Sequence, residues 1–236
     1  MIDRAPQQYP LEVALDDYAT FENFYVSDAN AAVCQYFRGI NTGDVLQYSY
    51  VWGASGSGRT HLLQAICHKA QSIGQSAFYI PLNMAAELSP AILEGLDTFD
   101  LVCLDDIDCV LGSDDWESAL FSLFNALRDA DVRFIVSSSI GPMALEVNLK
   151  DLQSRLQSAV VFQLQTPQDA DKLCALQLRA HKRGFELADD VARYVLQRNE
   201  RSMSGLFDFL ERLDQHSLIT KRKITIPLVR ELMASA

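Results

Sequence analysis

The chain has 236 residues, of which 49% are hydrophobic and 22% are charged. A chain of this length and composition buries enough apolar surface for about one and a half domains, which excludes a mainly disordered protein. No apolar run reaches the roughly 18 residues that a transmembrane helix needs, and residues 1–17 lack the apolar core of a signal peptide, so we expect a cytoplasmic protein without a membrane partner.

The net charge of −11 arises from 20 basic and 31 acidic residues. Such an acidic chain is a poor general binder of nucleic acid, because phosphate contacts need clustered lysine and arginine. The charge is unevenly distributed: residues 1–167 contain 8 basic and 21 acidic side chains, whereas residues 168–236 contain 12 basic and 10 acidic ones. This difference predicts two structural units. The small positive charge of the second unit would support at most a weak contact with DNA.

Short β-rich runs alternate with helical patterns over the first two thirds of the chain. The expected strands cover residues 48–52, 77–81, 101–105, 133–137 and 160–164, and the expected helices cover residues 60–72, 84–95 and 116–130. Strands that alternate with helices predict an α/β fold, in which a parallel five-stranded sheet is flanked by helices.

After residue 167 the pattern becomes helical, with segments at about 169–183, 188–199, 202–219 and 227–233. We therefore expect three parts: a flexible arm over residues 1–17, an α/β domain over 18–167, and a small all-helical domain over 168–236. The five cysteines are odd in number and form no CxxC pair, which is typical of free, buried thiols in a reducing compartment.

The strongest motif follows the first expected strand and opens a helix. Its spacing matches G-x-x-x-x-G-K-[ST], with arginine in place of lysine. Glycines let backbone N–H groups turn toward an anion, and the helix amino terminus adds further free N–H groups. The motif predicts a phosphate-binding loop; the alternative is an ordinary glycine- and serine-rich turn. Its residues are Gly53, Ala54, Ser55, Gly56, Ser57, Gly58, Arg59 and Thr60.

Arg59 is the unusual position of this loop. A guanidinium is wider than an ammonium and forked, so we expect Arg59 to hold a diphosphate well and to serve poorly in γ-phosphoryl transfer. The expected nucleotide is therefore ADP rather than ATP, with Mg²⁺ held by the Thr60 hydroxyl and with weak or no intrinsic ATPase activity.

The strand at residues 101–105 ends in two carboxylates, Asp105 and Asp106. In P-loop proteins an acid at this strand end holds Mg²⁺ and another residue orients the attacking water, so we expect Asp105 to bind the metal and Asp106 to act in catalysis. The alternative is two acids that merely end a strand. Ser137 and Ser138 end the next strand, where they either sense a γ-phosphate or hydrogen-bond the turn.

In this order, and followed by a helical domain, these elements resemble the AAA+ ATPases and, among them, the DnaA-like bacterial replication initiators. The resemblance depends on TFENFYV at residues 20–26 with Asn30 downstream, on LDDID at 104–108, and on DLQSRL at 151–156. It covers about residues 18–236. It stops before the initiators' helix-turn-helix DNA-binding domain, which we do not expect here.

The resemblance implies that the helical domain is a lid over the nucleotide. It also implies that Phe24, Val26, His61 and Ser204 contact the nucleotide together with the loop. Ser204 stands where DnaA-like lids carry a sensor arginine. A lid without that cation contacts a triphosphate weakly, which again favours a diphosphate.

The resemblance further implies that Arg155 is an arginine finger. It would act on ATP held by DnaA rather than on this chain's own nucleotide, and an arginine supplied in trans is worth roughly 10³–10⁵ in rate. The alternative is a surface arginine paired with Asp151 one helical turn away.

QYPLEV at residues 8–13 resembles the short peptide with which DnaA-homologous regulators bind the sliding clamp of DNA polymerase III. Gln8, Leu11 and Val13 would fill a preformed pocket on the clamp. A pattern this short also occurs by chance in many unrelated tails.

Together these features favour an inhibitory regulator of replication initiation that joins DnaA to the clamp and triggers ATP hydrolysis on DnaA. The alternative is an autonomous AAA+ ATPase that acts as a helicase-loader-like assembly factor. A small-molecule kinase is disfavoured, because no substrate pocket or basic lid is evident. Self-association through AAA+ contacts is plausible for either of the first two.

Overall fold

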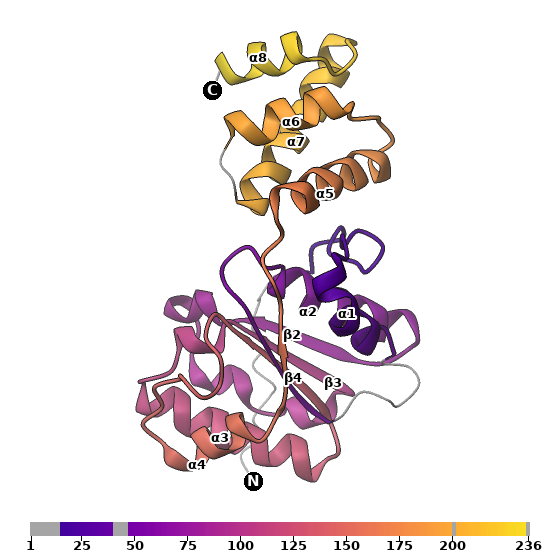
Figure 1. Cartoon of the computed structure of the whole chain (residues 1–236). Coiled ribbons are helices and arrows are strands. Elements are labelled where there is room, and N and C mark those ends of the chain that lie inside the picture. The colour runs from indigo at the N-terminus through magenta and orange to yellow at the C-terminus, as the bar shows by residue number, and fades with distance from the viewer. Residues whose placement is uncertain (1–14, 40–46, 200–201, 235–236) are drawn as a thin grey trace.

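The computed structural model describes residues 15–39, 47–199 and 202–234. Figure 1 shows two units along the chain, a sheet flanked by helices and, above it, a group of four helices that begins at α5. Residues 1–14, which make up most of the predicted arm, lie outside the described residues, as do 40–46, 200–201 and 235–236.

Five parallel strands form the sheet, in the order β2-β3-β4-β1-β5. This arrangement confirms the predicted α/β fold. The first three strands have the predicted bounds, whereas the fourth is one residue longer and the fifth is one residue shorter than predicted. The strands are β1 Tyr48–Trp52, β2 Ala77–Pro81, β3 Leu101–Asp105, β4 Arg133–Ser138 and β5 Val160–Gln163.

Helices cover both faces of the sheet, so its central strands are apolar on both sides. In β3, Val102 and Leu104 pack toward α3 (Asp114–Asp129) and α4 (Lys150–Gln157), while Leu101 and Cys103 pack toward α1 (Ala31–Arg38) and α2 (Arg59–Ser72). Successive side chains of a strand point to opposite faces, which explains the continuous apolar runs in the sequence.

The prediction of a helix over residues 84–95 is wrong. This stretch instead forms three short 3₁₀ turns, Leu82–Glu87, Pro90–Leu93 and Leu96–Thr98. Pro90 has no N–H to donate to a preceding turn, and Gly95 adopts a left-handed φ of 75°, so a continuous helix cannot form. The prediction of buried thiols holds for Cys34, Cys67 and Cys103, whereas Cys109 is exposed and Cys174 is half-buried.

The helical unit has a core of its own. Its four helices are α5 Asp169–Lys182, α6 Asp189–Arg198, α7 Met203–Thr220 and α8 Ile226–Ala234. Their apolar faces enclose Leu176, Val195, Leu210 and Val229, each fully buried. Contact with the sheet unit includes the guanidinium of Arg179, which lies 4.5 Å from the ring centroid of Tyr18.

We expect Leu63→Ala to lower the free energy of unfolding by about 2–5 kcal/mol, because the side chain is fully buried between α2 and the sheet. Chemical unfolding followed by circular dichroism measures this loss. Leu218→Ala is the matched control: the same truncation at a side chain that is 71% exposed should cost less than about 0.5 kcal/mol. Equal losses in the two variants would contradict this description of the core.

Candidate functional site

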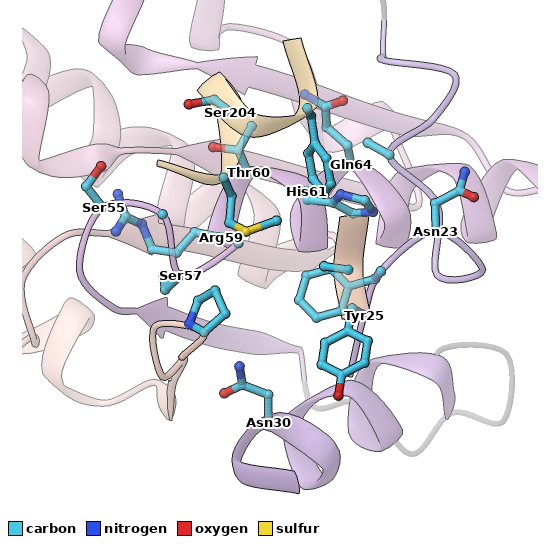
Figure 2. A pocket seen from close by; sticks show the side chains of 18 of the residues that line it. Asn23, Tyr25, Asn30, Ser55, Ser57, Arg59, Thr60, His61, Gln64 and Ser204 are labelled. Carbon is cyan, nitrogen blue, oxygen red and sulfur yellow. The ribbon is translucent and has the colours of Figure 1, made fainter. Parts of the chain in front are cut away.

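A cavity of about 420 Å³ lies between the loop before α2, the segment 16–30, Ala175 of α5 and the start of α7. Figure 2 shows Ser55 and Arg59 on one side of it and Asn23 on the other. Most of the residues predicted to hold a nucleotide or act on it line this one cavity. They are Phe24, Ser55, Gly56, Ser57, Gly58, Arg59, Thr60, His61, Asp106 and Ser204.

The loop before α2 has the backbone geometry that an anion requires. Gly56 and Gly58 have left-handed φ angles of 78° and 96°, and a Cβ on Gly58 would come within 2.9 Å of the Phe24 ring. The Ser57 hydroxyl is buried and has no hydrogen-bond partner among the described residues. A phosphate oxygen would satisfy this hydroxyl and the free N–H groups at the start of α2.

Segment 16–30 forms one wall of the cavity and is attached to α2 through His61. The His61 ring lies 5.1 Å from that of Phe24, and its Nε2 donates to the Thr20 carbonyl at 2.9 Å. Burial lowers the pKa of His61 below its usual value, so the ring is neutral near pH 7. Val26, predicted as a nucleotide contact, does not line the cavity and packs instead against the core under α2.

Asn30 is a lining residue to which the sequence assigned no role. Its side chain is buried and makes two hydrogen bonds to the backbone of Gln165, from Nδ2 to the carbonyl at 3.0 Å and from the main-chain N–H to Oδ1 at 2.9 Å. Gln165 belongs to the segment between β5 and α5. Asn30 therefore fixes the chain where it leaves the sheet for the lid.

Asp105 lies behind the cavity rather than in its wall. The side chain is 1% exposed, and its two oxygens accept hydrogen bonds from the Tyr79 hydroxyl, at 2.8 Å, and from the Ser137 hydroxyl. Neither Ser137 nor Ser138 lines the cavity, and the Ser138 hydroxyl accepts from the main-chain N–H of Ile140. The strand-end hydroxyls therefore hold neighbouring polar groups.

Asp106 does line the cavity, and Arg59 holds it there. Its backbone is left-handed, with φ 57°, and its Oδ1 accepts from Nη2 of Arg59 at 2.6 Å. The other terminal nitrogen of Arg59 donates to the carbonyl of Gly53 at the start of the loop. Burial raises the pKa of Asp106 above its usual value, and the hydrogen bond from Arg59 opposes that rise.

Arg155 lies at the opposite edge of the sheet. Its guanidinium is 5.8 Å from the ring centroid of Phe124 and borders a small cavity that includes Tyr48 and Phe134, near the amino ends of β1 and β4. The phosphate loop follows the carboxyl end of β1, about 15 Å away along a five-residue strand. No ion pair joins Arg155 to Asp151 in the part of the chain that the structure describes.

Glu117 positions the helix that carries Arg155, and our sequence analysis assigned no role to it. Its buried carboxylate accepts from the main-chain N–H groups of Gly112 at 2.8 Å, Asn148 at 3.1 Å and Leu149 at 2.7 Å. Leu149 is the residue before α4, so one acid on α3 ties down the start of that helix. A glutamate in an otherwise apolar helical stripe is the only sequence signal that pointed to it.

Ser204, which lines the cavity, lies exposed in the first turn of α7, with its hydroxyl 3.4 Å from that of Ser202. The remaining predicted positions lie outside the cavity or are not described. Gly53 is buried and Ala54 is exposed, and neither borders the cavity. Gln8, Leu11 and Val13, predicted to bind the clamp, lie outside the described residues.

The described residues contain neither a membrane-spanning helix nor a metal-binding cluster. No helix in 15–39, 47–199 or 202–234 has the length and apolarity to cross a bilayer. Within the same residues, no group of three or more histidine, cysteine, aspartate or glutamate side chains is placed to hold a metal ion.

Comparison with known proteins gives two family matches. Residues 15–163 match the family described as bacterial DnaA ATPase domain, and residues 169–233 match the one described as Hda, lid domain.

Solved structures share the fold at low sequence identity. Domain III of the Thermotoga maritima replication initiation protein DnaA has a TM-score of 0.77 at 22% identity, covering 94% of this chain and 98% of that one. AMPPCP-bound DnaA from Aquifex aeolicus has a TM-score of 0.71 at 21% identity, and the match covers 85% of this chain and 66% of that one, so this chain spans about two thirds of that protein. The T. maritima RuvB Holliday junction branch migration motor has a TM-score of 0.66 at 15% identity, and the match covers 92% of this chain and 73% of that one.

We expect Glu117→Gln to destabilise the start of α4 by about 1–3 kcal/mol, because an amide that replaces the carboxylate turns a donor toward one of three buried N–H groups. Amide hydrogen exchange should become faster at Asn148 and Leu149. Glu146→Gln, the same change at an exposed side chain, is the control and should leave the exchange rates unaltered. Unchanged protection in Glu117→Gln would show that the carboxylate does not hold α4.

Proposed function

We propose that this chain, which belongs to the family of the bacterial DnaA ATPase domain, acts on DnaA itself. Its Hda-type lid supports this proposal, because the two matches together are typical of regulators of replication initiation. In this proposal the chain holds a nucleotide, binds the DNA-loaded sliding clamp, and stimulates hydrolysis of the ATP that DnaA carries. The result is inhibition of further initiation in the cytoplasm.

The position of Arg155 carries this proposal. Its guanidinium lies at the amino edge of the sheet, whereas the chain's own phosphate loop lies at the carboxyl edge. An arginine so placed is remote from its own nucleotide and is available to a neighbouring AAA+ subunit. Contact with the Phe124 ring and the anchoring of α4 by Glu117 fix its direction before a partner binds. Facing the ATP of DnaA, it would stabilise negative charge on the departing phosphoryl group.

The chain's own nucleotide would act as a conformational switch, with ADP preferred. The cavity is shared between the sheet unit and the lid, so an occupant that contacts both would fix their relative position. Among the lid residues that the structure describes, those that line the cavity include Ser204 in the first turn of α7 and no cation. Less charge compensation for a third phosphate favours a diphosphate.

The alternative, an autonomous ATPase, would need Asp106 to orient an attacking water. Its carboxylate is instead bound at 2.6 Å by Arg59. That ion pair supports a role as a nucleotide-dependent regulator over one as a motor or assembly ATPase. Self-association through AAA+ contacts remains part of the proposal, since the same edge that would meet DnaA would also fit a second copy.

We expect Arg155→Ala to lower the stimulated rate of DnaA-bound ATP hydrolysis roughly 10³-fold or more. The assay uses DnaA preloaded with radiolabelled ATP, clamp loaded on DNA, and this protein in its ADP form. Lys150→Ala removes an exposed cation from the first turn of the same helix and should keep the wild-type rate. Full stimulation by Arg155→Ala would refute the trans-acting role.

For the clamp, we expect Gln8→Ala and Leu11→Ala each to weaken binding at least about tenfold, because anchor residues that enter a preformed pocket dominate such interfaces. Fluorescence anisotropy of labelled protein titrated with clamp measures the affinity. Gln7→Ala, the same truncation one residue earlier, is the control and should bind as wild type does. If all three variants bind equally well, this peptide is not the clamp-binding segment.

A further inference from the structure

The side chains at the end of β3 do not fit a divalent cation. Asp105, the acid in the usual metal position, has both carboxylate oxygens hydrogen-bonded by Tyr79 and Ser137, and it lies outside the cavity. A cation in the cavity would not meet Asp105, whose 1% exposed carboxylate lies behind the wall and already accepts from two buried hydroxyls. Asp106 faces the cavity, but the guanidinium of Arg59 already occupies it.

The cation at this place is Arg59 itself. Its side chain is 11% exposed and spans the loop, with one terminal nitrogen on the Gly53 carbonyl and the other on Asp106. Its Nε–H is buried and has no hydrogen-bond partner among the described residues. The guanidinium is therefore inside the phosphate loop, held in one orientation, and retains a donor that is not satisfied by the protein.

We propose that Arg59 takes the place of the divalent cation, so that this chain binds a nucleoside diphosphate without Mg²⁺. The inference rests on the nucleotide binding proposed above. Backbone N–H groups of the loop and the Ser57 hydroxyl would bind the phosphate oxygens, and the fixed guanidinium would supply the positive charge that Mg²⁺ supplies elsewhere. Asp106 positions the guanidinium of Arg59, and that guanidinium compensates the negative charge of Asp106.

Arginine and lysine should behave differently at position 59. Lysine carries a compact charge on a flexible chain and has no second terminal nitrogen with which to hold Asp106 and the Gly53 carbonyl together. In Arg59→Lys the ammonium would move between partners, and Asp106 would become available to a metal ion. Binding should then depend on Mg²⁺.

The test is a titration of the full chain with a fluorescent ADP analogue, in buffer with MgCl₂ and in buffer with EDTA. We expect the wild-type dissociation constants in the two buffers to differ by less than about threefold. For Arg59→Lys we expect the constant to rise at least about tenfold on going from MgCl₂ to EDTA. Arg193→Lys, the same substitution at an exposed position of α6, should behave as wild type.

Each result has one meaning. A wild-type affinity that falls tenfold or more in EDTA overturns the substitution of Arg59 for the metal ion and leaves the proposed regulator intact. No binding of the analogue in either buffer overturns both. The wild-type comparison needs no variant, so it decides the question even if Arg59→Lys fails to fold, which circular dichroism and binding in MgCl₂ would reveal.

Discussion

The nucleotide site depends on how two adjacent carboxylates are accommodated where β3 ends. A buried carboxylate is unfavourable unless hydrogen bonds or an opposite charge compensate it. The chain solves the two cases differently: Asp105 turns inward to the hydroxyls of Tyr79 and Ser137, and Asp106 turns outward to Arg59. The left-handed backbone at Asp106 gives it this separate direction. Its N–H also donates to the Ser137 hydroxyl at 2.9 Å, which connects both acids to β4.

A parallel sheet separates the two activities that we propose. The loop, the paired acids and the lid gather at the carboxyl ends of the strands, while Arg155 lies at the amino ends. One buried polar side chain fixes each edge to its neighbouring segment: Asn30 binds the chain leaving for the lid, and Glu117 binds the chain entering α4. The five hydrogen-bonded strands lie between the two sites, so a partner at one edge and a nucleotide at the other do not compete for the same surface.

The strands and the loop were predictable because their signals are local. Continuous apolar runs between turns marked the strands within one residue, and the glycine spacing placed the loop. The stretch from Leu82 to Thr98 was not predictable by periodicity, since apolar residues recur there while Pro90 prevents a helix. Contacts between residues far apart in the chain could not be predicted from the sequence either. Nothing near Asp105 indicates that Tyr79 and Ser137 donate to it, and nothing near Asn30 indicates that it binds Gln165, which lies 135 residues away.

One arginine in the loop connects two of the properties that we propose. An arginine that reaches Asp106 withdraws the carboxylate best placed to orient water, which disfavours hydrolysis of the chain's own nucleotide. The same contact keeps a permanent positive charge among the phosphate-binding groups, which in our proposal takes the place of a metal ion. A protein that must keep a diphosphate and act on a partner's triphosphate gains from both effects. A lysine in this loop could keep the charge but not the fixed contact with Asp106, so it would separate the two properties.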